Sequence, residues 1–227
     1  MNAIEIRNLY KKYKEHVLYE DASLTVGEGH TVGIIGANGT GKSVLFRLIA
    51  GLEYADGGEI LVRGKAVGKD QDFPENIGIF VNQPGYIEFY DGFTNLKLLA
   101  EVRHVISDQQ IRDCMRRLGL NPDDHTKVKN YSAGMKQKLG IAQAVMENQT
   151  IILLDEPFNA LDFQTNAEIF SILKQLKEEK KTILLTSHQQ DFLEKVCDEL
   201  YIILNKKLVP FTEEIRRSYF SLFGNGT

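Results

Sequence analysis

The chain carries Gly36-Ala37-Asn38-Gly39-Thr40-Gly41-Lys42-Ser43 between two segments of different character. The preceding segment, 30–35, is short, apolar and rich in β-branched residues, which predicts a buried strand of a parallel sheet. The following segment, 42–50, places apolar residues at helical spacing, and Gly51 stands where a helix would end. The sequence therefore predicts a glycine-rich turn that leads from a buried strand into a helix.

This turn has the spacing G-x-x-x-x-G-K-S of a phosphate-binding loop. Glycines allow successive backbone N–H groups to converge on an anion, and the helix N-terminus adds positive potential. Lys42 supplies a charge for the β- and γ-phosphates, and the Ser43 hydroxyl is a ligand for Mg²⁺. We expect a nucleoside triphosphate to be bound by Gly36, Ala37, Asn38, Gly39, Thr40, Gly41, Lys42 and Ser43.

A second apolar segment, Ile151–Leu154, ends in the two carboxylates Asp155 and Glu156. Asp155 can hold Mg²⁺ through water, and Glu156 can orient or deprotonate a water that attacks the γ-phosphate. The structural alternative is a buried strand followed by an acidic helix cap. A small-molecule kinase needs no carboxylate aimed at water, and a GTPase needs an Asn-Lys-x-Asp guanine-binding sequence, whose Asp is lacking in Asn205-Lys206-Lys207-Leu208. Hydrolysis of ATP is therefore favoured.

The composition is typical of a soluble globular protein, with 227 residues, 43% hydrophobic and 26% charged, and a formal net charge of -4. The only cysteines are Cys114 and Cys197, which excludes a disulfide-rich scaffold and favours a reducing compartment such as the cytoplasm. The mild acidity argues against non-specific binding of nucleic acid. Because no apolar run approaches the roughly 20 residues that span a bilayer, we expect any membrane role to depend on a partner.

The order of segments predicts an α/β fold with a mostly parallel sheet. Two strand-like segments, 3–9 and 17–26, precede the phosphate loop and predict an antiparallel β subdomain at the N-terminus. Amphipathic helices replace strands between about 86 and 139, which predicts a helical insertion. Further strands are expected at 59–62, 151–154, 182–186 and 199–204, and helices at 95–105, 108–118, 164–179 and 189–197. We expect a single domain, 1–227, with an ATP-binding core in 1–85 and 148–205, a helical subdomain in about 86–147 and a short tail in 206–227.

With these motifs the chain resembles the nucleotide-binding subunit of ATP-binding cassette (ABC) proteins, from about Ile4 to Leu204. The resemblance implies a P-loop NTPase core that uses ATP and Mg²⁺. Tyr13 matches the family's aromatic residue that stacks on adenine, since a flat π surface favours a purine; the alternative is a strand-edge tyrosine. Gln83, in Val81-Asn82-Gln83-Pro84, matches the family glutamine that contacts Mg²⁺ or the attacking water and joins the core to the helical insertion.

The segment Tyr131-Ser132-Ala133-Gly134-Met135 stands in the place of the family's Leu-Ser-Gly-Gly-Gln signature. By itself, Ser132 predicts a helix N-cap in front of an apolar stripe. The resemblance implies that Ser132 and Gly134 also bind the γ-phosphate held by a second copy of the protein. Ala133 and Met135 depart from the signature, so we expect a working site with altered packing. The form of this segment is similar to that of drug and antibiotic exporters, including bacitracin-type exporters.

Two further positions follow the order of the family. Asn159-Ala160-Leu161-Asp162 resembles the loop in which Asp162 would couple the two sites of a dimer. His188 follows an apolar strand and matches the switch histidine, whose imidazole would hold the γ-phosphate and orient Glu156. A single histidine is more often structural, and here its spacing after the Asp-Glu pair favours the functional interpretation. The expected catalytic residues are thus Lys42, Gln83, Glu156 and His188, and the expected metal ligands are Ser43, Gln83 and Asp155.

The resemblance implies an ATPase subunit that forms a homodimer, or a heterodimer with a homologous subunit, around two ATP molecules. Such a subunit would be cytoplasmic, peripheral on the inner face of the cell membrane, and would drive solute export through a separate transmembrane permease, without nucleic acid. The alternative is a soluble ABC ATPase that acts on protein partners, of the iron–sulfur assembly or cell-division type. A scaffold that binds nucleotide without turnover is disfavoured because Glu156 and His188 are both present.

Overall fold

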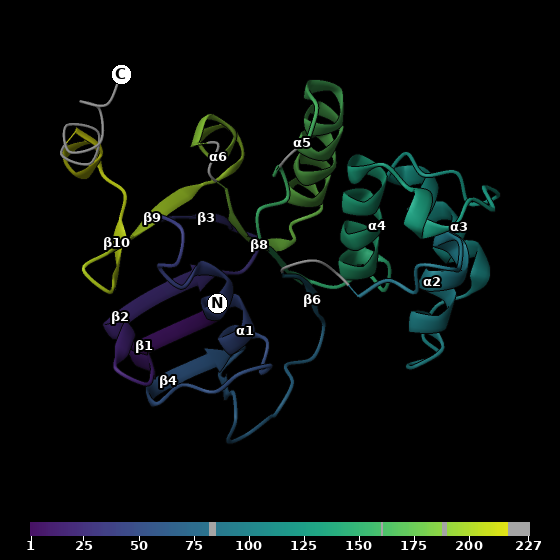
Figure 1. The fold of residues 1–227 in the computed structure, drawn as a ribbon. Helices are drawn as coiled ribbons and strands as arrows, with labels where there is room; N and C mark the ends of the chain where they lie inside the picture. Colours follow the sequence, from purple (N-terminus) through teal and green to yellow (C-terminus); the bar gives the residue numbers. More distant parts are fainter. Residues whose placement is uncertain (82–84, 160, 188–189, 218–227) are drawn as a thin grey trace.

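The computed structural model of the chain describes residues 1–81, 85–159, 161–187 and 190–217. Within these residues the strands form two sheets, with helices packed against both faces of the larger one (Figure 1). The larger sheet has, in spatial order, β10 (Lys207–Pro210), β9 (Glu199–Leu204), β3 (Thr31–Ile35), β8 (Thr182–Thr186), β7 (Ile151–Leu154) and β6 (Ile77–Phe80). The smaller sheet has β2 (His16–Gly27), β1 (Asn2–Tyr13), β4 (Gly57–Val62) and β5 (Lys65–Ala66).

The larger sheet is parallel from β9 to β6, and β10 adds an antiparallel strand at the β9 edge. Every residue of β3, β7 and β8 is buried, as befits parallel strands covered on both faces. Because β8 lies between β3 and β7, the carboxyl ends of these three strands meet at one edge of the sheet. The loops that follow them in the chain are therefore brought together there.

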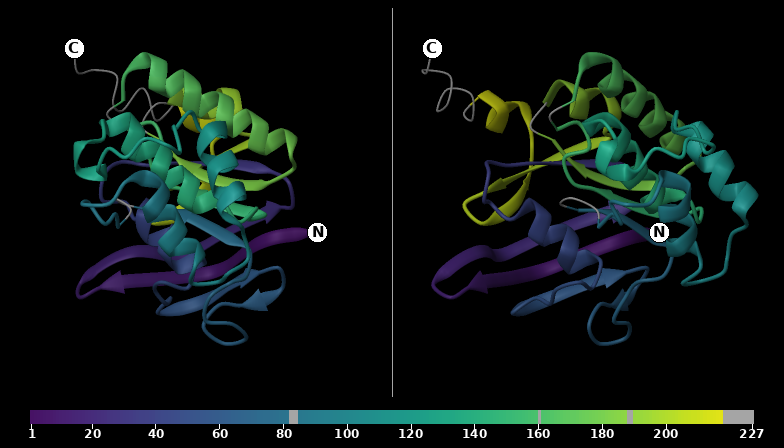
Figure 2. Two further views of the ribbon diagram at one scale, coloured as in Figure 1. Left: turned by 90° about the vertical axis from the view of Figure 1, so that its right-hand side faces the viewer. Right: turned by 45° about the vertical axis from the view of Figure 1, so that its right-hand side comes forward.

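Alternate residues of β7 point into two different cores. Ile152 and Leu154 belong to a cluster with α5 (Phe163–Glu178) and the helical subdomain, whereas Ile151 and Leu153 belong to one with α1 (Lys42–Ile49) and the smaller sheet. The two views in Figure 2 show the smaller sheet on one face of the larger sheet and α5 on the other. The parallel sheet is thus a central layer that fixes the ends of β3, β7 and β8.

The helical subdomain lies at the side of the molecule next to β6 (Figure 1) and consists of α2 (Gly92–Ala100), α3 (Asp108–Arg117), the 3₁₀ turn η1 (Val128–Asn130) and α4 (Ala133–Val145). Its helices begin at side-chain caps: Asp91 accepts from the Thr94 N–H at 2.7 Å, and Ser107 forms a capping box with Gln110. Gly78 of β6 lets α4 approach closely, since a Cβ at this position would lie 1.7 Å from the Ala144 carbonyl oxygen. The position of α4 relative to the larger sheet is therefore tightly constrained.

The strands at 151–154, 182–186 and 199–204 are found with the predicted bounds. The helix predicted at 95–105 instead begins at Gly92, because Asp91 caps it, and ends at Ala100. Three strands were not predicted, the first of them the two-residue β5. β6 has a glycine in a four-residue strand, which hides its pattern, and β10 lies in the segment that was expected to be a short tail. β10 completes the larger sheet by a tight hairpin through Asn205 and Lys206, both at positive φ. Between β8 and β9 the chain forms the helix α6 (Gln190–Val196).

Candidate active site

The phosphate loop joins β3 to α1 and is held in a closed turn. Thr40 Oγ1 donates to the Ala37 carbonyl at 2.9 Å, and Gly36 leaves room for this hydroxyl, because a Cβ there would lie 2.7 Å from Thr40 Oγ1. Gly39 and Gly41 have φ of 80° and 105°, a region that disfavours residues with a side chain. The glycine spacing in the sequence is thus required by the backbone of the loop.

Lys42 reaches back across this loop from the first turn of α1. Its Nζ donates to the Gly36 carbonyl at 2.7 Å and lies 3.7 Å from Glu156 Oε1. The Lys42 side chain is buried, so its charge is held in place by these groups. One ammonium therefore contacts both the loop after β3 and the carboxylate after β7.

The predicted metal ligands Ser43 and Asp155 are in contact. Ser43 Oγ donates to Asp155 Oδ2, and Thr186 Oγ1 donates to Asp155 Oδ1 at 2.7 Å. A hydroxyl and a carboxylate are the hard oxygen ligands that Mg²⁺ prefers, usually with water and substrate phosphates as further ligands. Their chemistry therefore fits Mg²⁺, although within the described residues no group of three or more His, Cys, Asp or Glu could form a metal cage by itself.

Thr186 was not predicted as a site residue. Its hydroxyl donates to Asp155 and also accepts the Glu156 N–H at 2.9 Å, so it fixes both carboxylate residues from the neighbouring strand β8. The available signal was the change from apolar to polar residues at Thr186-Ser187, which marks the carboxyl end of β8 beside that of β7.

Tyr19 of β2 was not predicted as a site residue either. Its side chain is fully buried, and its hydroxyl donates to the Gly41 carbonyl at 3.0 Å. Burial raises the pKa of the Tyr19 phenol well above its ordinary value, so it remains a donor. The smaller sheet thus supports the phosphate loop through the hydrogen bond from the Tyr19 hydroxyl to the Gly41 carbonyl.

We expect Tyr19→Phe to lower the free energy of unfolding by about 1 kcal/mol, because it leaves the buried Gly41 carbonyl without this donor. Urea denaturation measures the change. Tyr201→Phe is the matched control, since the Tyr201 hydroxyl donates only to the exposed Glu199 and its loss should cost little. Equal stabilities of the two variants would contradict the support of the phosphate loop by the Tyr19 hydroxyl.

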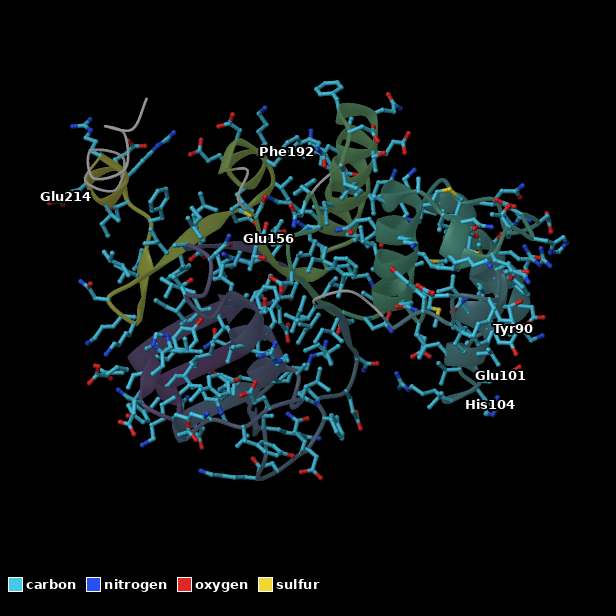
Figure 3. The ribbon with its side chains drawn as sticks, viewed as in Figure 1. Tyr90, Glu101, His104, Glu156, Phe192 and Glu214 are labelled. Atoms are coloured by element: carbon cyan, nitrogen blue, oxygen red, sulfur yellow. The ribbon has the colours of Figure 1, made fainter. Side chains whose placement is uncertain are left out.

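A cleft of about 1170 Å³ opens where these loops meet. Figure 3 shows Glu156 near the middle of the molecule, between the larger sheet and the helices beyond it. The cleft is lined from the core by residues of the phosphate loop, of β2 and of the segment after β7, and from the helical subdomain by the first two turns of α4 and the segment before α2. Its lining includes Leu18, Asn38, Gly39, Gly41, Lys42, Ser43, Tyr86, Ala133, Gln137, Asp155 and Glu156. This volume is ample for a nucleoside triphosphate.

Ser132 and Asp162 are both exposed helix N-caps outside this lining. Ser132 Oγ accepts the Met135 N–H of α4 at 3.1 Å, and Asp162 accepts the Thr165 N–H of α5 at 2.9 Å. The hydrogen bond from the Thr165 N–H lowers the pKa of Asp162. Gly134 allows the first turns of α4 and α5 to approach closely, because a Cβ there would lie 2.8 Å from the Thr165 side chain. The two N-caps therefore begin neighbouring helices.

Tyr13, at the end of β1, is half-exposed and is not among the residues that line the cleft. Its hydroxyl bonds with Glu53, and the Lys11 ammonium lies 5.0 Å from its ring centroid. Burial against this cluster raises the pKa of the Tyr13 phenol. Adenine stacking by Tyr13 stays a prediction. The predicted residues Gln83 and His188 lie outside the described residues.

Comparison with known proteins agrees with this geometry. The family described as ABC transporter matches residues 19–159. The ABC transporter ATP-binding protein YybJ of Bacillus subtilis is 40% identical over 195 residues, which are 86% of this chain and 89% of that protein. This chain belongs to the ABC transporter family. The bacitracin transport ATP-binding protein BcrA of Enterococcus faecalis is 31% identical over 91% of this chain and 68% of its own length.

Solved structures give the same answer for this ABC subunit. The dimeric structure of a bacterial ABC transporter cassette is 25% identical, with a TM-score of 0.79 over 90% of this chain and 96% of that one. The α/β fold with a P-loop NTPase core is thereby confirmed, and the chain is an ATP-binding and ATP-hydrolysing subunit that drives transport through a separate membrane subunit. In the part of the chain that the structure describes, no helix has both the length and the apolar character to cross a membrane.

Proposed function

We propose that this ABC subunit binds MgATP in the cleft and hydrolyses it with Glu156. The observation that carries the proposal is the chain of contacts from Ser43 through Asp155 to Thr186, which joins the ends of β3, β7 and β8 around one point. There the loop N–H groups and Lys42 bind the phosphates, while Ser43 and Asp155 hold Mg²⁺. Bound Mg²⁺ supplies neutralisation of the phosphate charge that develops during transfer.

Glu156 takes a proton from the attacking water, and its position supports this role. Its Oε1 lies 3.7 Å from Lys42 Nζ, so the carboxylate is on the side where Lys42 meets the phosphates. Its backbone N–H is fixed by Thr186 at 2.9 Å. By resemblance, Gln83 and His188 complete the site by contacting the metal or water and the γ-phosphate, and Tyr13 stacks on adenine.

The active form is a head-to-tail dimer with a copy of itself or a homologous subunit. Ser132 and Asp162 support this proposal, because both are exposed beside each other and neither lines the cleft of their own chain. A helix N-terminus binds anions through its free N–H groups, so Ser132 and Gly134 would contact the γ-phosphate in the other subunit. The dimeric structure of a similar bacterial cassette supports a dimer.

The helical subdomain carries the surface that receives the permease, which would hold the subunit at the inner face of the membrane. Exposed apolar side chains gather on α2 and its flanking segments, namely Ile87, Phe89, Tyr90, Leu98, Leu99 and Val102. Figure 3 shows Tyr90, Glu101 and His104 at the outer side of this subdomain. Several exposed apolar side chains in one subdomain are typical of a protein interface. The likeness to a bacitracin transport protein supports export of an antibiotic or drug.

We expect Phe89→Ser to weaken binding of the permease by about 30-fold, because an exposed aromatic side chain at an interface contributes about 2 kcal/mol. The measurement is co-purification with the membrane partner, followed by the stimulation of ATPase activity by candidate compounds. Phe73→Ser is the matched control, since the two phenylalanines are 66% and 64% exposed and Phe73 lies outside the helical subdomain, between β5 and β6. Equal losses in both variants would contradict the proposed surface.

A further inference from the structure

Gln137, on the second turn of α4, contacts the backbone of Glu156 across the cleft. Its Nε2 donates to the Glu156 carbonyl at 3.1 Å, and the same carbonyl accepts the Asn159 N–H at 3.1 Å. The peptide that follows Glu156 leads into Pro157, so this carbonyl closes the turn by which the chain leaves β7. The helical subdomain therefore touches the catalytic segment through a side chain of the same subunit.

The backbone of Glu156 is held in an unfavourable conformation. Its φ is 52°, in the left-handed region that residues other than glycine avoid at a cost of about 1–3 kcal/mol. Two side chains bond to this backbone from opposite sides, Thr186 at the N–H and Gln137 at the carbonyl. Thr186 belongs to the central sheet and Gln137 to α4, so the direction of the Glu156 carboxylate depends on how α4 lies on the sheet.

The same helix begins at the surface proposed to face the second subunit. Ser132 caps α4, and Gln137 follows five residues later, about 7.5 Å along the helix axis. Two contacts hold the first turns of α4 and a third holds its last turn. Gly134 abuts Thr165 of α5, the Tyr86 hydroxyl donates to the Lys136 carbonyl, and Gly78 abuts the Ala144 backbone.

We propose that Gln137 is a positioning residue for Glu156 and that through it α4 links contact with the second subunit at Ser132 to the carboxylate of its own site. The proposal rests on the function proposed above for Glu156 and Ser132. Gly78 constrains α4 at Ala144, so contact with a second subunit at Ser132 would act on the first turns of the helix. There the Gln137 amide bonds to the strained backbone of Glu156, and a displacement of this amide would change the direction of the carboxylate.

The test uses Gln137→Met, which removes the amide at similar size, and Gln137→Glu, which keeps the shape but cannot donate when ionised. All three residues have similar helix propensities, so the helix itself should be unaffected. We expect kcat for ATP to fall about 5- to 10-fold in both variants, as fits one lost hydrogen bond, with KM changed less than about twofold. Without nucleotide, hydrogen exchange at the Glu156 and Asn159 amides should be faster in both.

Gln109→Met is the matched control, because Gln109 lies on α3 and bonds only to the exposed Asp113 at 2.9 Å. It should leave kcat and both exchange rates unchanged. Unchanged kcat in Gln137→Met, or a lower kcat without faster exchange, would overturn the proposal. If Glu156→Gln itself kept normal turnover, the role of Glu156 would fail instead, so the two failures are distinguishable.

Discussion

Glu156→Gln should reduce ATP hydrolysis by about 10²- to 10³-fold while ATP still binds, because general base catalysis contributes on this scale. The amide has the shape of the carboxylate but cannot take a proton from water. The backbone position of this residue should be kept, since Thr186 and Gln137 bond to its N–H and carbonyl, which the substitution leaves in place. Steady-state turnover and calorimetric binding of ATP measure the two effects separately.

The loss of hydrolysis should also make the ATP-bound dimer long-lived. Because ATP binds across the proposed interface, a subunit that cannot split it should stay dimeric, and size-exclusion chromatography with ATP would show this. Glu199→Gln is the control, since Glu199 is an exposed carboxylate on β9 next to His30. It should hydrolyse ATP normally. Near-normal turnover in Glu156→Gln would remove Glu156 as the catalytic carboxylate.

The turn that joins β3 to α1 could be predicted because its constraints are local. The left-handed conformations of Gly39 and Gly41 and the contact of Gly36 with Thr40 arise within one short turn, so the residue types reveal them. The strand Ile151–Leu154 was equally clear, since its apolar run is buried on both faces. Such features depend little on the rest of the chain.

Other features depend on which distant segments meet. Three side chains of the site bond to partners far away in the chain. The separation is 31 positions for Thr186 and Asp155, 22 for Tyr19 and Gly41, and 19 for Gln137 and Glu156. A single polar residue in the sequence gives no sign of such a partner. Asp162 shows a different difficulty. The family resemblance implied a role in coupling between subunits, which stays a prediction, and the structure shows that Asp162 caps α5. Both roles use one exposed carboxylate, so a cap in the structure does not exclude the interface.

Ser132→Arg should weaken ATP-dependent dimerisation by at least about 100-fold, because a long side chain cannot enter the space that a serine hydroxyl occupies against the second subunit. Binding of ATP to the single subunit should remain, since Ser132 does not line the cleft of its own chain. The dimer is best measured by light scattering in the Glu156→Gln background, where hydrolysis does not dissolve it.

Loss of the helix cap must be separated from loss of the interface, since replacing an N-cap serine costs about 1 kcal/mol of stability. Ser107→Arg provides this control, because Ser107 caps α3 through the Gln110 N–H as Ser132 caps α4 through the Met135 N–H. Both variants should lose similar stability, but only Ser132→Arg should lose the dimer. If the dimer survives Ser132→Arg, α4 does not begin at the interface, and its proposed link to Glu156 would have no input from a second subunit.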